Sequence, residues 1–426
     1  MDFVTQLALA RYEKIGEIVG KCVERVEKPQ TFSDLIDTVV LDKYLGIPIF
    51  LALMWAVFQF SFTVSAPFSD AIDLFFSFCS DWAKSSISNP ELASFIGDGI
   101  FGGWGFVLVF LPPITFVFIA LAILEDSGYL SRAAFVMDRA MTKVGLQGKS
   151  FIPMLLGFGC NVPAIMATRT IEDETDRKIT IMVNPLMSCS ARLPVYMLFA
   201  GVFFKEIAGA VITSMYLLGI LLAGIMATVF RKFVFRGKPS PLLLEMPPYE
   251  IPTFKSVLSN AWARTRLFLK KAATVLFIGA VVMWFLTTHP WSATNGGELV
   301  QNSYASTIGH IIEPVIKPLG LDWTAGVALL GGFMAKEIVV GTFGMIYGVG
   351  EESVADVISK HFTPPSALAL MVITLIYVPC LATIGVLRSE LGSWKWTAFV
   401  VVYELILAYI VAWIVYIAIH YGLGVP

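Results

Sequence analysis

Long apolar stretches separated by short charged segments dominate this chain of 426 residues. A helix that crosses the hydrocarbon core of a bilayer needs about 20 consecutive apolar residues. Six uncharged runs reach that length, at residues 45–69, 99–124, 207–230, 272–297, 361–387 and 405–426. This pattern predicts an all-α, polytopic membrane protein with about seven or eight transmembrane helices.

The composition agrees with that prediction. The chain is 57% hydrophobic and 15% charged, and its mean hydropathy is +0.76, far from the values of an ordinary soluble domain. A net charge of −2 gives no basic field for nucleic acid, so we exclude that class of partner. Residues 1–28 form a charged amphipathic stretch rather than a signal peptide.

Charge asymmetry orients the predicted spans, because cytoplasmic loops are enriched in Lys and Arg. Residues 231–271 hold nine lysines or arginines and two glutamates, which predicts a cytoplasmic loop. Residues 125–150 are also basic. Residues 67–98 hold five acidic side chains and one lysine, and residues 288–322 hold a single lysine, so both are predicted to be external. The count gives about seven spans and an external C-terminus.

One apolar stretch between the two cytoplasmic loops must turn back. Residues 151–168 are short and are interrupted by Gly157, Gly159 and Pro163, which predicts a re-entrant segment. Irregular backbone at membrane depth is tolerated only where it is buried in protein or lines a cavity. The sequence therefore places a pathway beside this segment.

A weak internal repeat extends the same idea. Residues 155–160 (LLGFGC) resemble residues 329–333 (LLGGF), and residues 185–194 (PLMSCSARLP) parallel residues 376–385 (IYVPCLATIG). The charge pattern makes the first copy enter from the cytoplasm and the second from outside. An inverted repeat with discontinuous helices usually forms its substrate site near the midplane, although glycine-rich helices also resemble one another by chance.

Three cysteines lie beside helix-breaking residues within these segments: Cys160, Cys189 and Cys380. Broken helices free backbone carbonyls, and a nearby thiol adds a soft ligand. Together they suit a borderline transition metal better than magnesium or calcium. The alternative for each is a small buried apolar residue.

Polar neighbours enlarge the candidate site. Three of them are expected to add metal ligands: Asn161, Ser188 and Ser190. Charged groups at membrane depth usually face a cavity or a counter-charge, and methionines near the breaks offer thioethers. We expect seven residues to line the ion path or its gate: Glu125, Asp126, Arg192, Lys336, Glu337, Met154 and Met187. A structural ion pair is the alternative for Lys336 and Glu337.

A phosphate-binding loop is excluded. Gly148, Lys149 and Ser150 look like the end of such a loop, but Lys143 occupies the place of its first glycine and apolar residues follow. The chain is therefore expected to be a transporter rather than an enzyme.

Long motifs in the chain resemble the ferrous-iron transport protein B (FeoB) family. They are residues 124–141, 145–196, 331–348 and 377–392, which include LEDSGYLSRAAF, GFGCNVPA, GGFMAKEIVVG and YVPCLATIG. By position, the family's gate cysteines fall on Cys160, Cys189 and Cys380. The resemblance implies a multi-pass permease of a bacterial or archaeal cytoplasmic membrane, with Fe²⁺ as its transported substrate and no bound organic cofactor.

The resemblance also implies partners. Family members normally begin with a GTP-binding domain and a helical linker, and residues 1–28 resemble the end of that linker. We therefore expect the membrane part of a longer or split protein, gated by a GTP-binding domain outside this chain in which any GTPase activity resides. Small cytoplasmic accessory proteins are further expected partners, and a homo-oligomer is left open.

The expected organisation has six parts: residues 1–44 as a cytoplasmic linker remnant and amphipathic helix, 45–100 as the first span and an external segment, 101–230 as gate repeat 1, 231–270 as the cytoplasmic basic loop, 271–395 as gate repeat 2, and 396–426 as the C-terminal span. Two other functions remain open at this stage. One is a gate-domain transporter of an organic solute such as a nucleoside, and the other is a membrane anchor for a regulatory GTPase.

Overall fold

A computed structural model describes residues 3–22, 32–42, 45–235, 237, 248–269, 273–289, 303–347, 349 and 353–422. Within these ranges every regular element is a helix. The predicted all-α architecture is therefore confirmed. The predicted basic loop lies partly outside the described residues, at 236, 238–247 and 270, as do residues 23–31 of the predicted linker remnant.

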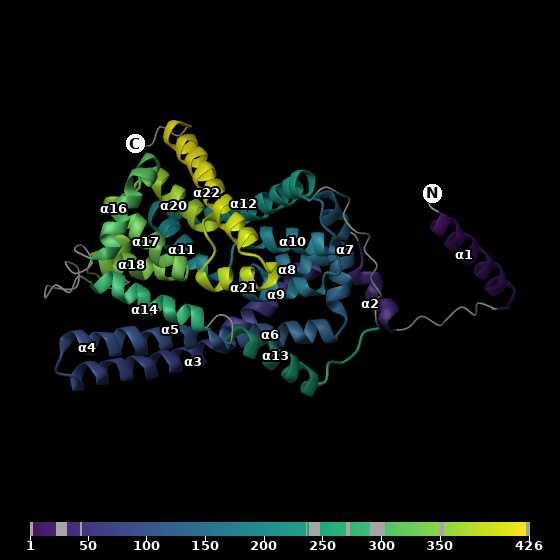
Figure 1. Cartoon of the computed structure of the whole chain (residues 1–426), viewed down its shortest axis with the longest axis horizontal. Coiled ribbons are helices and arrows are strands. Elements are labelled where there is room, and N and C mark those ends of the chain that lie inside the picture. Colours follow the sequence, from purple (N-terminus) through teal and green to yellow (C-terminus); the bar gives the residue numbers. More distant parts are fainter. Residues whose placement is uncertain are drawn as a thin grey trace.

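The helices are given below in chain order, in three consecutive groups, and Figure 1 shows their arrangement in space. The first group contains α1 (Phe3–Cys22), α2 (Phe32–Val40), α3 (Gly46–Ser86), α4 (Pro90–Ser94), α5 (Gly103–Val109), α6 (Leu111–Asp126) and α7 (Tyr129–Lys143). The second contains α8 (Phe151–Leu156), α9 (Asn161–Ala167), α10 (Glu174–Val183), α11 (Leu193–Phe203) and α12 (Ala208–Val229). The third contains α13 (Phe254–Phe268), α14 (Thr274–Thr288), α16 (Tyr304–Ile316), α17 (Trp323–Met334), α18 (Ile338–Tyr347), α19 (Val354–His361), α20 (Pro364–Ile376), α21 (Leu381–Leu391) and α22 (Trp394–Gly422).

Six helical segments of the described chain are long and apolar enough to cross a membrane, as expected for a multi-pass membrane protein. They are Pro48–Ser86, Pro90–Asp126, Glu174–Phe203, Lys205–Val234, Pro364–Leu391 and Trp394–Tyr421. Within the run predicted at 272–297, residues 274–288 form the shorter α14, and residues 272 and 290–297 lie outside the described residues. The helix ends at Thr288, and the backbone of His289 is extended (φ −109°, ψ 148°), because a residue that precedes a proline disfavours the helical conformation.

A long hairpin projects from one side of the molecule. Helix α3 has 41 residues, so it is about 60 Å long, twice the thickness of a bilayer core. It packs against α5 and α6, and α4 lies at its tip (Figure 1). A salt bridge of 2.6 Å between Lys84 and Asp98 joins its two arms. The acidic segment predicted to be external thus forms this projection.

The first repeat contains a hairpin and a broken span. Helices α8 and α9 pack against each other, and a 2.9 Å salt bridge joins Lys149, just before the hairpin, to the exposed Glu172, just after it. The segment that was predicted to be re-entrant thus forms a helical hairpin. Helices α10 and α11 follow as two halves of one span, separated by the irregular stretch that carries Cys189.

The second repeat copies this plan. Helices α17 and α18 form the hairpin, and α20 and α21 form the broken span around Cys380. Equivalent contacts occur in pairs: α9 packs against α21 as α18 packs against α11, and α10 packs against α12 as α20 packs against α22. Helix α20 lies at the centre of the core, and every residue from Pro365 to Ile376 is buried.

The two broken spans run antiparallel. The start of α10 lies beside the end of α21, where Glu390 pairs with Arg177 at 2.8 Å. At the opposite end, the ring of Phe199 in α11 lies 5.5 Å from that of Phe362, just before α20. The inverted repeat predicted from the sequence is therefore present in the fold.

Candidate metal-transport site

The three predicted cysteines line one cavity of about 300 Å³ between the two repeats. Repeat 1 contributes a wall that includes Cys160, Asn161, Cys189 and Ser190. Repeat 2 contributes a wall that includes Lys336, Glu337, Cys380 and Thr383. The remaining wall is largely apolar and is formed by α5, α6, α13 and α14, through Phe106, Phe110, Ile114, Phe268 and Leu276. Sulfur, oxygen and charged groups therefore face a hydrophobic surface.

Each cysteine lies at the residue that precedes a helix. Cys160 precedes α9, Cys189 precedes a short 3-10 turn that leads into α11, and Cys380 precedes α21. The N-terminus of a helix favours negative charge, so a metal-bound thiolate is accommodated at all three positions. The Sγ atom of Cys380 also lies 3.1 Å from the Oγ1 atom of Thr383. Thr383 is three residues later on the same helix face, a spacing that identifies such a partner in a sequence.

In repeat 1, the helix break at Cys160 packs closely against the helix break at Cys189, and these contacts fix the two breaks relative to each other. A Cβ atom at Gly157 would lie 2.6 Å from the side-chain oxygen of Asn184 and 2.8 Å from the Cβ of Met187, so a glycine is required there. The Ser190 hydroxyl donates a hydrogen bond of 2.9 Å to the carbonyl of Gly159. Ser190 therefore joins the Cys160 break to the Cys189 break, in addition to lining the cavity.

Two buried cationic side chains donate hydrogen bonds to backbone carbonyls that the helix breaks leave without a helical partner. The Arg192 guanidinium donates to the carbonyls of Met187 and Pro185 at 3.0 and 2.9 Å. The Lys336 ammonium donates to the carbonyls of Val378 and Tyr377 at 2.7 and 3.4 Å. These carbonyls serve as partners for cationic side chains rather than for the metal, contrary to our expectation. In the described structure the Lys336 ammonium binds these carbonyls rather than Glu337, which lines the cavity.

We expect Arg192→Met to destabilise the protein without removing any candidate metal ligand. The substitution leaves two buried carbonyls without donors, at a cost of about 1–3 kcal/mol each. Thermal unfolding in detergent should show a clear fall in Tm. The exposed Lys395→Met serves as the control. An Arg192→Met protein as stable as this control would contradict the capping role.

Several candidate residues lie away from the cavity. Ser188 is fully buried and its hydroxyl contacts the Tyr196 hydroxyl at 3.1 Å. Met154 and Met187 are buried in the main hydrophobic core. All three are described, and none is among the residues that line the cavity with the cysteines. Their side chains point into the packing behind the breaks, a distinction that sequence spacing does not reveal.

No closed metal site is preformed. Among the residues that the structure describes, no three His, Cys, Asp or Glu side chains are grouped closely enough to hold one metal ion. The thiols share a cavity but do not converge on one point. A cation in this cavity would therefore bind the thiols one after another, each thiol replacing one water ligand. Binding to all three thiols at once would require the walls of the cavity to move closer together.

A second cavity, of about 400 Å³, lies on the side predicted to be cytoplasmic. The tip of the α8–α9 hairpin lines the cysteine cavity, and its body lines this second one through Leu156, Pro163 and Met166. Glu125 also lines it and pairs with Arg264 at 2.5 Å. Asp126 follows as the last residue of α6. The hairpin thus separates the cysteines from this vestibule.

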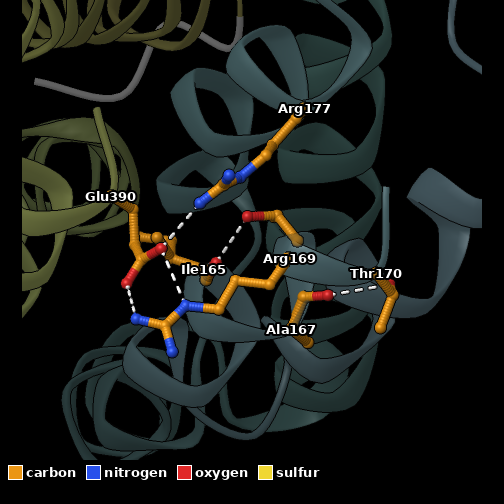
Figure 2. Close-up of polar contacts among 7 residues, drawn as sticks. Ile165, Ala167, Arg169, Thr170, Arg177 and Glu390 are labelled. Carbon is orange, nitrogen blue, oxygen red and sulfur yellow. Dashed lines mark hydrogen bonds and ion pairs between the residues drawn. The ribbon is translucent and has the colours of Figure 1, made fainter. Parts of the chain in front are cut away.

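An ionic cluster joins the two repeats beside the vestibule (Figure 2). The Glu390 carboxylate at the end of α21 accepts hydrogen bonds from Arg169 at 2.5 and 3.0 Å and from Arg177 at 2.8 Å. The Glu390 side chain is 2% exposed, and those of Arg169 and Arg177 are 47% and 31% exposed. The hydrogen bonds that Arg169 donates to Glu390 raise the pKa of Arg169. Sequence analysis missed this cluster because Glu390 is more than 200 positions away from both arginines.

Known families match most of the chain. A family model described as Gate, nucleoside recognition, matches residues 107–203 and 269–394, which contain both repeats. A second model, described as ferrous iron transport protein B C terminus, matches residues 212–264. No solved structure matches the chain.

The curated relatives agree with one another. The Fe(2+) transporter FeoB of Methanocaldococcus jannaschii is 48% identical over 95% of this chain and 61% of its own length. The Fe(2+) transporter FeoB of Campylobacter jejuni is 38% identical over 94% of this chain and 67% of its own length. A Fe(2+) transport protein A/Fe(2+) transporter FeoB fusion protein of Porphyromonas gingivalis is 38% identical over 95% of this chain and 54% of its length. The chain thus spans about 60% of the length of the first relatives it matches. On the strength of these relatives and of the motifs around its three cysteines, the chain belongs to the FeoB family of Fe(2+) transporters.

Proposed function

We propose that this chain is a permease that carries Fe²⁺ inward across the cytoplasmic membrane. The observation that carries the proposal is that Cys160, Cys189 and Cys380 all line the same cavity, which lies between two antiparallel broken spans. Thiols favour transition metals over magnesium and calcium. The relatives bear the name Fe(2+) transporter. Fe²⁺ is the cargo, and no organic cofactor is needed.

The transport step is an exchange of ligands. Fe²⁺ enters the cavity with part of its water shell, and the thiols of Cys160 and Cys189 replace water with sulfur and release protons to solvent as they bind. Cys380 approaches from the other repeat. Small shifts of the two hairpins then open one end of the cavity at a time. On the cytoplasmic side, the Glu390 cluster holds the ends of α10 and α21 together and must separate for the ion to leave.

The partners are proposed from the relatives. The chain matches about 60% of their length, and we infer that a GTP-binding domain acts on the cytoplasmic face of the permease. One relative is named as a fusion with an Fe(2+) transport protein A, which supports a small accessory protein as a further partner. Both would act on the side where Glu390, Glu125 and the basic loops lie.

Flux of radioactive Fe²⁺ into proteoliposomes tests the proposal. The purified chain should admit Fe²⁺ above the rate of protein-free liposomes, and adding the GTP-binding domain of a relative with GTP should change that rate. Equal flux with and without the chain, under both conditions, would contradict the permease function. Metal flux through the purified chain would also exclude the alternative of a membrane anchor that carries nothing.

A nucleoside carrier is the second candidate, because the matching family model is described as nucleoside recognition. The cavity has three phenylalanines along one wall, Phe106, Phe110 and Phe268, which offer a surface for a base. Its single carboxamide, Asn161, offers little hydrogen-bonding capacity. Labelled nucleoside in the same vesicles separates the two functions, and we expect uptake of Fe²⁺ but not of the nucleoside.

A further inference from the structure

Backbone geometry identifies equivalent residues in the two repeats. The hairpins break at Cys160 (φ −155°, ψ 131°) and at Ala335 (φ −152°, ψ 138°). The spans break at Cys189 (φ −72°, ψ 159°) and at Cys380 (φ −56°, ψ 156°). Within each pair the conformations agree to within 16°. The inverted repeat therefore relates Cys160 to Ala335 and Cys189 to Cys380.

All four of these positions line the cysteine cavity. Three of them carry a thiol, and the fourth, Ala335, carries a methyl group. The symmetry of the fold thus defines four equivalent positions around the cavity. Ala335 is the one position whose side chain cannot bind a metal. That difference between the repeats lies at the proposed metal path.

The residues that follow the hairpin breaks also differ. Asn161 and Val162 follow Cys160, whereas Lys336 and Glu337 follow Ala335, and all four line the cavity. The Lys336 ammonium donates hydrogen bonds to the carbonyls of the α20–α21 break, and these carbonyls stabilise its positive charge. In the described part of the chain, Glu337 is therefore not the partner of the Lys336 ammonium, and it lines the cavity. Repeat 2 therefore has an alanine where repeat 1 has Cys160, and it presents a carboxylate two residues later, at the position equivalent to Val162.

A carboxylate instead of a fourth thiol affects which metal ion the cavity binds most tightly. Four thiolates arranged tetrahedrally form a preferred structural zinc site. Replacing one sulfur with a carboxylate oxygen makes the set harder, and carboxylates favour metals such as Mn²⁺ more than thiolates do. A set of three sulfurs and one oxygen consequently discriminates less strongly in favour of Zn²⁺ than four sulfurs would.

We propose that Glu337 is an oxygen ligand of the transported ion and that the alanine at position 335 weakens Zn²⁺ binding relative to Fe²⁺. This inference rests on the proposed function, since it names the residues that select the cargo. Glu337 binds the ion together with the thiols as the walls of the cavity close. A cysteine at 335 would complete the four-sulfur set and favour Zn²⁺.

Two substitutions test this assignment in the full chain. Glu337→Gln removes the charge at constant size and should raise the KM for Fe²⁺ by about tenfold or more, whereas Glu337→Asp retains a carboxylate and should retain most uptake. Ala335→Cys should raise the ratio of Zn²⁺ to Fe²⁺ uptake by about tenfold. Ala191→Cys also places a thiol in this cavity, but outside the four equivalent positions, and should leave that ratio unchanged.

Spectra of the Co²⁺-loaded protein give a second readout that does not depend on transport. Thiolate ligands produce sulfur-to-cobalt charge-transfer absorption, which should increase in Ala335→Cys and not in Ala191→Cys. A Glu337→Gln protein with wild-type KM, or an Ala335→Cys protein that matches Ala191→Cys in both assays, would overturn the inference. If the wild-type chain carries no Fe²⁺ at all, the proposed function fails, and the Co²⁺ spectra still decide the ligand assignment.

Discussion

Replacing Cys160 and Cys189 together by serine is expected to reduce Fe²⁺ uptake by at least about 100-fold. Loss of a residue that only hydrogen-bonds to a metal ligand already lowers metal affinity or activity by about 10–100-fold. Both thiols line the cavity, and both belong to the repeat whose two breaks are joined through Ser190 and Gly159. Serine keeps the size of the side chain but replaces sulfur with a hydroxyl, a much weaker ligand for a transition metal. Uptake into proteoliposomes gives the measurement.

Cys79→Ser is the matched control. Cys79 is a free cysteine on α3, away from the cavity, and its replacement should leave uptake at the wild-type rate. Gel filtration in detergent checks that the double variant remains folded. Wild-type flux from a folded Cys160→Ser/Cys189→Ser protein would dispose of the ligand role.

Glu390→Gln is expected to open the cytoplasmic side of the permease. The buried carboxylate is shared by Arg169 and Arg177, and its loss leaves two like charges adjacent. Breaking a fully buried pair costs about 3–5 kcal/mol, but both arginines are partly exposed, so solvent reduces the effect to about 1–2 kcal/mol. That range corresponds to an increase of about tenfold in the population of the open state.

Reaction of Cys160 with a membrane-impermeant thiol reagent measures this opening. With the reagent on the cytoplasmic side, the rate of modification in Glu390→Gln should rise about tenfold over that of the unsubstituted protein. Glu172→Gln is the control, because Glu172 is exposed and pairs with Lys149 within one repeat. Equal rates in Glu390→Gln and Glu172→Gln would mean that the cluster does not close the path.

The sequence predicted the architecture well because membrane insertion imposes strong constraints. Apolar length identified most of the spans, and interrupted helices identified the hairpin and the inverted repeat. The span Glu174–Phe203 was not among the six uncharged runs, because it carries charged residues in its first turns. Within the run 272–297, α14 ends at Thr288, because His289 precedes a proline, which a count of apolar residues does not take into account. Local sequence rules locate the breaks, and the breaks locate the cavity.

The site was predicted less completely. The three cysteines were identified from the residues beside them, and the fold places them around one cavity. Ser188 flanks Cys189 as closely as Ser190 does, and Met187 is only one position further away, yet Ser188 and Met187 do not line the cavity, since an irregular break has no fixed periodicity. Glu390 and the equivalence of Ala335 to Cys160 depend on how two distant segments pack. Neither is visible before the repeats are placed in space.

X-ray absorption at the iron edge tests the central claim most directly, because it reports the atoms bound to the ion in the full chain. The account predicts sulfur neighbours at about 2.3 Å, the distance typical of a metal–thiolate bond, together with oxygen neighbours. Fe²⁺ bound to the wild-type protein by oxygen and nitrogen alone would contradict it.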